Sequence, residues 1–171
     1  EKNMLVFPRR ALYSLRNGWQ LHSGWNNHIY INKNFNVKQP LPINGIETIV
    51  LPDTFQKNNF VIGFLQYNDS MVYVNTSVGL FDVNILSKSF NLISELQGKV
   101  NNVCYNTHTK EYAFCTDFGA YIKSNLKNWG SLKKMNLPLA NKVSCGSADI
   151  KGRWWFGTNN GLYTINGKNI K

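Results

Sequence analysis

The sequence predicts an all-β protein: a β-propeller with about four blade-like units, each of four antiparallel strands. Three observations predict this fold. Gly79, Gly119 and Gly161 each open an apolar segment and are 40 and 42 residues apart, whereas a propeller blade repeats about every 40–50 residues. The apolar segments are short, aromatic and β-branched, and polar turn residues bound them, which is typical of strands. Helical periodicity is nearly absent. A unit this short cannot bury its own apolar faces, so it must stack on its neighbours.

The 171 residues suit one domain that can bury a sizeable core. We expect a single propeller-type domain over residues 1–171, with residues 1–8 as a closing strand. The units are residues 9–44, 60–97, 100–138 and 141–171. The chain begins with Glu1 rather than Met, so we expect a processed protein or a piece excised from a longer one.

The first unit is the weakest copy of the repeat. Its segment Asn17–Ile31 aligns with the fourth unit at an offset of about three blade lengths, but His28 stands where the other copies have glycine. Histidine sometimes accepts the positive φ that such a turn needs. The strands expected here are Ala11–Leu15, Gly18–His22, His28–Asn32 and Val37–Leu41.

The second and third units share one order of a polar turn, an apolar strand, a short polar turn, a glycine and another apolar strand. The strands expected in the second unit are Phe60–Tyr67, Met71–Asn75, Gly79–Val83 and Phe90–Glu95. Those expected in the third are Val100–Tyr105, Tyr112–Thr116, Ala120–Lys123 and Ser131–Met135. Four hairpin-connected strands per unit fit a propeller blade.

The fourth unit has three expected strands and lacks its outermost one. The three are Val143–Ser147, Trp154–Gly157 and Leu162–Ile165. Because propellers often close by letting the N-terminal strand complete the last blade, we expect Met4–Phe7 to pair with Leu162–Ile165. The alternative is that the four units are one arc of a larger ring.

Two local expectations follow from this pattern. Gly79, Gly119 and Gly161 lie at tight hairpins, where we expect positive φ. In the Trp154-Trp155 pair the side chains alternate between faces, and we expect Trp155 to be the less buried of the two.

Composition narrows the classes of function. The net charge is +10, but the lysines are scattered and form no dense basic run, so we do not expect a nucleic-acid partner. No apolar stretch is long enough to span a membrane as a helix. Asn fills much of the polar surface, which suits the many tight turns of an all-β chain.

The three cysteines have no spacing suited to zinc or to a redox pair. Cys104 and Cys145 occupy matching places in consecutive units, where small apolar side chains fit the crowded centre of a propeller. We therefore expect buried free thiols. A bridge between Cys104 and Cys115 within one hairpin is the alternative.

The stretch Gly152–Gly167 resembles the two-component regulator propeller repeat. The matching residues are Trp155, Gly157, Thr158, Gly161, Leu162 and Tyr163 in the fourth unit, Tyr73, Thr76, Gly79, Leu80 and Phe81 in the second, and Phe114, Thr116, Gly119 and Tyr121 in the third. Cys115 replaces the inner glycine of the third unit, and the first unit departs most. The resemblance implies the periplasmic or extracellular sensor region of a bacterial hybrid histidine kinase, with complex-glycan fragments as ligands. Such regions commonly carry more than four blades.

The sequence contains no set of residues with the spacing of a known catalytic site. His22, His28 and His108 have no metal-ligand spacing, and most aspartates are in turns, where they cap backbone groups. Glycoside hydrolysis needs two facing carboxyl groups, and no motif supplies them. We therefore expect no enzyme activity, no cofactor and no metal site.

Ligand binding is the function we expect, because propellers present loops around a channel. Aromatic rings beside polar groups suit sugars, whose C–H faces stack and whose hydroxyls hydrogen-bond. Arg9 and Arg10 suit an acidic glycan, or their stems only cover apolar surface. The candidate ligand-binding residues are Trp25, Asn26, Asn27, His28, Arg9, Arg10, Asn159 and Asn160.

Two classes of function remain open. One is a non-catalytic ligand sensor whose partners are an oligosaccharide or acidic glycan, together with further copies of the chain or the rest of a parent receptor. The other is a protein-interaction scaffold that binds no small molecule.

Overall fold

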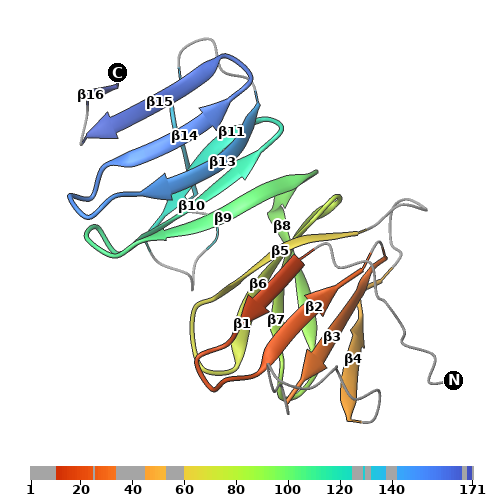
Figure 1. The fold of residues 1–171 in the computed structure, drawn as a ribbon. Coiled ribbons are helices and arrows are strands. Elements are labelled where there is room, and N and C mark those ends of the chain that lie inside the picture. The colour runs from red at the N-terminus through yellow and green to blue at the C-terminus, as the bar shows by residue number, and fades with distance from the viewer. Residues whose placement is uncertain are drawn as a thin grey trace, which may run out of the picture.

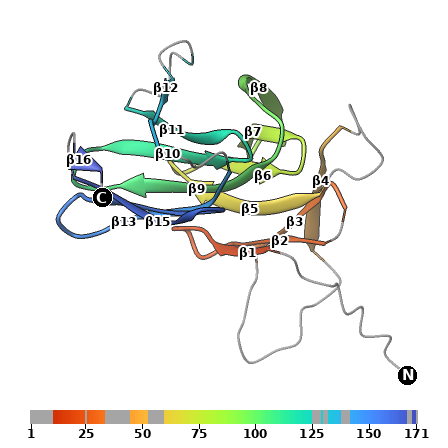
Figure 2. The ribbon, with the colours of Figure 1, turned by 90° about the horizontal axis from the view of Figure 1, so that it is seen from above.

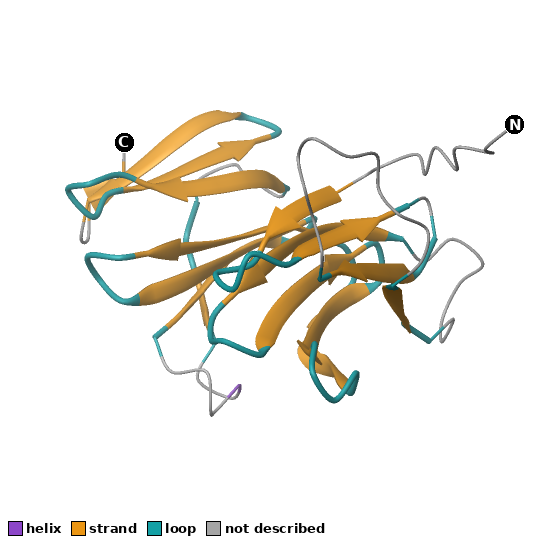
Figure 3. Cartoon of the chain, turned by 60° about the horizontal axis from the view of Figure 1, so that its bottom comes forward, coloured by secondary structure: helices purple, strands orange, loops and turns teal. Residues whose placement is uncertain are grey.

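The described residues form four antiparallel sheets of four strands each, confirming the all-β propeller architecture. The computed structural model describes residues 11–24, 26–33, 45–52, 60–124, 129, 132–137, 142–166 and 169–170. Strands make up almost all of the regular structure (Figure 3). The sheets follow one another along an arc, with the first and fourth at its opposite ends (Figure 1). The described residues therefore favour the arc over the closed ring.

Each sheet is a meander of consecutive strands. The first sheet contains β1 (Ala11–Ser14), β2 (Gln20–Ser23), β3 (His28–Asn32) and β4 (Ile46–Val50). The second contains β5 (Val61–Gln66), β6 (Met71–Thr76), β7 (Gly79–Asn84) and β8 (Phe90–Gln97). The third contains β9 (Val100–Asn106), β10 (Glu111–Thr116), β11 (Gly119–Lys123) and β12 (Lys133–Lys134). The fourth contains β13 (Val143–Ala148), β14 (Trp154–Thr158), β15 (Gly161–Asn166) and β16 (Asn169–Ile170).

The first strand of each sheet lies next to the first strand of the following sheet, so β1, β5, β9 and β13 follow one another through the stack. Strands β8 and β12 lie at its outer margin (Figure 2). Cys104 and Cys145 are both on these first strands, as predicted, but their positions do not match, because Cys104 pairs with Ala113 whereas Cys145 pairs with Gly157, which corresponds to Cys115.

Most predicted strands are confirmed to within two residues at each end, although one of them is much shorter than predicted, and the fourth strand of the first sheet is corrected. The predicted strand Ser131–Met135 shortens to Lys133–Lys134. The predicted strand Val37–Leu41 lies outside the described residues, and the fourth strand of the first sheet is Ile46–Val50, which the sequence analysis missed. The segment Ile46–Val50 is short, and we read it as part of a connection although it is rich in β-branched residues.

The fourth sheet also differs from the prediction, because it has a fourth strand. Ile165 pairs with Ile170, and Asn166 pairs with Asn169. The expectation of only three strands in this unit is therefore wrong. Met4–Phe7 lies outside the described residues, so its pairing with the fourth sheet stays a prediction.

The hairpins between the second and third strands of the last three sheets carry a shared Thr-x-x-Gly turn. In each, the threonine hydroxyl donates a hydrogen bond to the glycine carbonyl oxygen at 2.8 to 2.9 Å. The pairs are Thr76–Gly79, Thr116–Gly119 and Thr158–Gly161. The first sheet has a longer turn without this threonine, which explains why its repeat was the weakest in the sequence.

The positive φ predicted for the turn glycines is confirmed at two positions. Gly119 has φ +125° and Gly161 has φ +107°. Gly79 does not have positive φ, so that prediction is wrong. The reason for glycine there is space, since an added Cβ would lie 2.9 Å from Cδ1 of Leu92.

Asparagine side chains join neighbouring sheets, a role beyond the turns predicted for them. Asn75 on β6 donates to the carbonyl oxygen of Val100 on β9 at 3.2 Å. One sheet further on, Asn101 on β9 donates to the carbonyl oxygen of Val143 on β13 at 2.9 Å. The two acceptors are the first residues of β9 and β13, whereas the donors are on different strands of their sheets.

Three apolar clusters fill the junctions between consecutive sheets. The junction of the first and second sheets is mostly aliphatic. The junction of the second and third is aromatic, with ring centroids 5.8 Å apart for Tyr73 and Phe114 and 5.4 Å apart for Phe114 and Trp129. The junction of the third and fourth combines small residues of β10 and β11 with Trp154 and Phe156 of β14.

Two further expectations about side-chain burial can be compared with the structure. Trp154 is buried and Trp155 is only half-buried, as predicted. All three thiols are free. Cys115 is buried and Cys104 half-buried, but Cys145 is exposed, so the expectation of buried thiols is wrong for Cys145. It is on the face of the fourth sheet that points away from the third.

Candidate functional site

The predicted binding residues within the described part of the chain belong to two equivalent hairpin turns. Asn26 and Asn27 lie between β2 and β3, and His28 is the first residue of β3. Asn159 and Asn160 lie between β14 and β15. Two sheets separate these turns, so the structure does not bring the two groups together (Figure 1). Trp25, Arg9 and Arg10 lie outside the described residues, and their roles stay predictions.

Asn27 links the turn between β2 and β3 to Leu51, the residue that follows β4. Its side chain is buried, and its Nδ2 donates to the carbonyl oxygen of Leu51. The Leu51 amide donates in return to the Asn27 carbonyl oxygen at 3.0 Å. Asn27 therefore positions the turn and does not present its amide to a ligand.

Asn26, His28 and Tyr30 form a more accessible group on the same turn. The Asn26 Oδ1 accepts a hydrogen bond from the His28 amide at 3.2 Å, and its Nδ2 donates to the Tyr30 hydroxyl at 3.4 Å. The Tyr30 hydroxyl lies 3.3 Å from Nδ1 of His28. Sequence analysis missed Tyr30, although a residue two positions after His28 on a strand points to the same side.

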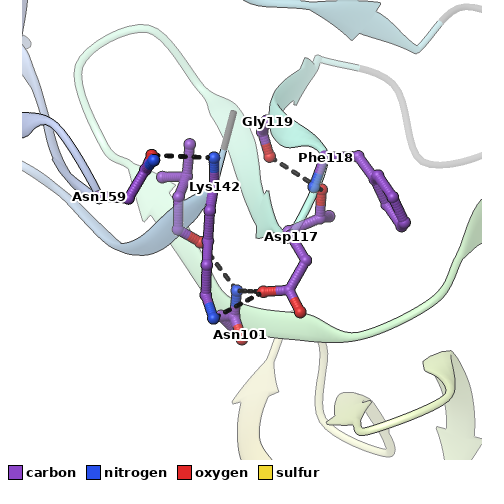
Figure 4. Close-up of polar contacts among 8 residues, drawn as sticks. Asn101, Asp117, Phe118, Gly119, Lys142 and Asn159 are labelled. Carbon is purple, nitrogen blue, oxygen red and sulfur yellow. Dashed lines mark hydrogen bonds and ion pairs between the residues drawn. The ribbon is translucent and has the colours of Figure 1, made fainter. Parts of the chain in front are cut away.

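Asn159 also has a structural role. The side-chain oxygen Oδ1 of Asn159 accepts a hydrogen bond from the backbone amide of Lys142 at 3.1 Å (Figure 4). The backbone amide of Asn159 donates in return to the Lys142 carbonyl oxygen, also at 3.1 Å. Asn160 is exposed, and its amide donates to the Thr158 hydroxyl at 3.0 Å. Both residues are exposed, but the side-chain oxygen of Asn159 accepts the hydrogen bond from Lys142.

A polar network connects this turn to the matching turn of the third sheet. Lys142 Nζ lies 3.5 Å from Oδ1 of Asp117, and the same oxygen accepts a hydrogen bond from Asn101 at 2.9 Å. Figure 4 shows these side chains converging on Asp117, with the ring of Phe118 directed away from them. We call Asn101, Asp117, Phe118, Lys142 and Asn159 the turn surface.

The charge on Asp117 is stabilised within this network. Partial burial by itself raises the pKa of the carboxyl group, but the hydrogen bond from Asn101 and the ammonium group of Lys142 outweigh that effect. The net pKa of Asp117 therefore lies below its ordinary value. Asp117 is a carboxylate at neutral pH, able to accept hydrogen bonds on the oxygen that faces away from Asn101.

Phe118 gives the turn surface an aromatic face. Its side chain is 62% exposed, and its amide donates to the Thr116 hydroxyl at 3.0 Å, which fixes the turn. Sequence analysis missed Asp117 and Phe118, although the repeat contained the signal. Both occupy the two variable positions of the Thr-x-x-Gly turn, as Asn159 and Asn160 do.

The arrangement offers contacts for a ligand. Among the described residues, no group of three or more His, Cys, Asp or Glu side chains is placed to hold a metal ion. In the same residues, no helix has the length and apolarity needed to cross a membrane. The turn surface combines an exposed ring with amide, ammonium and carboxylate groups, a combination that suits sugar hydroxyls and C–H faces.

Comparison with known proteins identifies the fold. No protein-family description matches the sequence, and no curated protein matches it either. The extracellular domain of the putative hybrid two component system BT4673 from B. thetaiotaomicron has a similar structure, with a TM-score of 0.73 and 15% identity. The similarity covers 95% of this chain and 22% of that one.

Two other solved structures are similar over about half of their own length. The WD40 β-propeller domain of Doa1 matches with a TM-score of 0.65 and 16% identity, over 91% of this chain and 49% of that chain. YCF48 bound to D1 peptide matches with a TM-score of 0.63 and 11% identity, over 94% of this chain and 50% of that chain. This chain thus spans a fifth to a half of these proteins. At such identities the likeness establishes the propeller fold.

Proposed function

We propose that this chain is a non-catalytic, ligand-sensing part of a bacterial two-component sensor, that it works outside the cytoplasm, and that its ligand is a glycan. The likeness to the extracellular domain of a hybrid two component system supports the sensor role. It agrees with the resemblance of the Gly152–Gly167 stretch to the two-component regulator propeller repeat.

The observation that carries the glycan proposal is the exposed ring of Phe118, which follows Asp117 in the chain and points away from the Asp117 network, so a ligand that contacts both would extend across the turn. A pyranose ring stacks its C–H face on an aromatic side chain, and its hydroxyls need donors and acceptors at the edge. Asp117 supplies an acceptor, and Lys142 and the exposed Asn160 supply donors. The position, on turns that join paired strands, is where propellers place ligand contacts.

A binding role fits this surface better than hydrolysis does. Glycosidases place two carboxyl groups on either side of the bond that breaks. The turn surface contains one, Asp117, and its pKa is lowered. A general acid needs the opposite shift, because it must hold its proton near neutral pH.

A glycan array, followed by thermal-shift titration with the sugars that bind, tests this proposal. We expect one class of oligosaccharide to raise the melting temperature saturably and Phe118→Ala to abolish the shift. Ile150→Ala is the matched control, because Ile150 is 96% exposed in a turn at the opposite end of the fourth sheet. Trp25→Ala, assayed in parallel, tests the site predicted on the first sheet.

A protein-interaction scaffold is the second candidate function. YCF48, one of the similar solved structures, is described as bound to a peptide. A flat response to all glycans, together with a specific protein partner whose binding Phe118→Ala removes, would support the scaffold and contradict glycan sensing.

A further inference from the structure

Asp82 on β7 is a half-buried carboxyl group at the junction of the second and third sheets. The ion pairs of the described residues use three other acids, Glu47, Asp117 and Asp149. None of them involves Asp82. This is unexpected in a chain with 19 lysines and arginines and only 9 acids, because a carboxylate removed from water is costly unless it is paired.

A row of four tyrosine rings begins at Asp82. The Tyr67 hydroxyl donates a hydrogen bond to Oδ1 of Asp82 at 2.7 Å. The Tyr67 ring stacks on Tyr73 with centroids 4.5 Å apart, and Tyr73 meets the edge of Tyr112 at 5.9 Å. Tyr105 lies 4.6 Å from Tyr112, again between centroids. We call Asp82, Tyr67, Tyr73, Tyr105 and Tyr112 the tyrosine junction.

The strand register assembles this group. Tyr73 and Asp82 are direct partners on β6 and β7, and Tyr105 and Tyr112 are direct partners on β9 and β10. Each pair therefore shares one face of its sheet. Tyr67 directly follows β5, so the group lies toward the β5–β6 and β9–β10 turns, at the other end of the sheets from the turn surface.

The tyrosine junction is accessible from solvent. Tyr105 is exposed, and Tyr67, Asp82 and Tyr112 are each half-buried. Tyr73 is buried and forms its floor. Four of the five side chains of the tyrosine junction therefore keep some contact with solvent.

The nearby cations do not neutralise Asp82. Arg16 is close enough to lower the pKa of the Tyr112 hydroxyl, although burial raises that pKa overall. Lys123 is paired with Tyr112 across β10 and β11, and its ammonium group lies 5.2 Å from the Trp129 ring centroid. Burial raises the pKa of Asp82, and the Tyr67 hydroxyl only partly offsets this.

We propose that the tyrosine junction binds a small organic cation, with the ammonium group of the ligand against the Asp82 carboxylate and the tyrosine rings. An ammonium group near a carboxylate forms a strong charge-assisted contact. Aromatic faces attract the same charge, most strongly where water is excluded. The ligand would supply the positive charge that the described residues do not place at Asp82.

Choline and its neutral isostere 3,3-dimethyl-1-butanol test the charge requirement, because the two differ mainly in one positive charge. Isothermal titration should show saturable binding of choline and binding of the isostere weaker by roughly tenfold or more. Choline should also shift the ring resonances of Tyr105 and Tyr112 in the nuclear magnetic resonance spectrum of the unaltered protein. This second measurement needs no variant.

Asp82→Asn tests the carboxylate, because it keeps the shape of the side chain and an oxygen that can accept from Tyr67. We expect it to weaken choline binding at least tenfold, whereas Asp149→Asn, at a carboxylate already paired with Arg153, leaves binding unchanged. Phe118→Ala should also leave choline binding unchanged, which separates this site from the glycan proposal. Absence of saturable choline binding, equal binding of the isostere, or unchanged binding by a folded Asp82→Asn variant would overturn the proposal.

Discussion

The two junctions on either side of the third sheet differ in how they are filled. Against the second sheet, the third presents large rings, with Tyr112, Phe114 and Trp129 packed around Tyr73. Against the fourth, it presents Ala113, Cys115 and Ala120. One sheet thus carries large residues on one face and small residues on the other, because successive side chains of a strand alternate between its faces.

The two junctions also differ in how closely the sheets approach each other. At the aromatic junction, Tyr67, Asp82 and Tyr112 are half-buried and Tyr105 is exposed. At the other junction, an added Cβ on Gly146 would lie 2.8 Å from Sγ of Cys115. Such close approach of the sheets leaves no space between them.

The largest expected effect comes from removing a ring at the aromatic junction. Phe114 is fully buried and contacts both Tyr73 and Trp129. Phe114→Ala should lower the free energy of unfolding by about 3–5 kcal/mol, because it loses burial and leaves a cavity. Urea denaturation measures it, with the exposed Phe118→Ala as control. Equal losses in the two variants would contradict the role given to the ring cluster.

Adding volume tests the close-packed junction. Gly146→Val should lower the free energy of unfolding by about 1–3 kcal/mol through overpacking, because the new side chain would meet Cys115 and the Phe156 ring, whose nearest atom is 3.1 Å from the added Cβ. Ser147→Val on the same strand faces away and is the matched control. A stable Gly146→Val variant would show that this junction can open.

The asparagine bonds between sheets should contribute similarly at both junctions. Asn101→Ala leaves the Val143 carbonyl oxygen without its side-chain donor, and Asn75→Ala does the same for Val100. We expect each to cost about 1–2 kcal/mol of unfolding free energy, measured by urea denaturation against the exposed Asn91→Ala. A cost at only one junction would show that packing, rather than these bonds, aligns the other pair of sheets.

The smallest effects are expected from pH, and they should have opposite signs at two aspartates. Burial alone would raise the pKa of Asp149, but hydrogen bonds from Arg153, Trp155 and the Lys151 amide lower it to about 2. Its stabilising contribution is therefore present above the unfolded-state pKa and lost as pH falls toward 2. Asp149→Asn should destabilise the protein at neutral pH, and this difference should disappear in acid.

Asp82 should behave in the opposite way, because its pKa is raised in the folded state. Folding favours its protonated form, so its contribution to stability is present below the unfolded-state pKa and lost as pH rises through the folded-state value. Asp82→Asn should be as stable as the parent protein in acid and more stable at neutral pH. Thermal unfolding of both variants across acid to neutral pH measures this. A destabilised Asp82→Asn at neutral pH would mean that its charge is compensated within the protein.

The repeat made most of this fold predictable from sequence. Glycines at blade spacing, each before an apolar segment, located the hairpins of the second and third sheets to within two residues. Ile46–Val50 was missed because nothing in its own sequence shows which strand it pairs with. Asn169–Ile170 was missed because two residues carry no periodicity.

The candidate site was less predictable, because side-chain contacts between sheets leave no pattern in a single sequence. Asn159 was predicted to contact a ligand, yet its side-chain oxygen accepts a hydrogen bond from the backbone amide of Lys142. Phe118 was overlooked, yet its turn position matches that of Asn160. Asp82 and Tyr67 are 15 residues apart, and only the register of β5 to β7 brings them together.

The short β12 strand has a consequence for solubility. An outer strand with free backbone groups can recruit a strand from another molecule, and aggregation begins in this way. Here the third sheet ends in two residues, Lys133 and Lys134, both exposed. Their like charges repel a second copy of the same margin, and two residues offer too few backbone groups to hold an incoming strand. Replacing both lysines with valine should therefore promote concentration-dependent fibre or oligomer formation without changing the interior of the sheet.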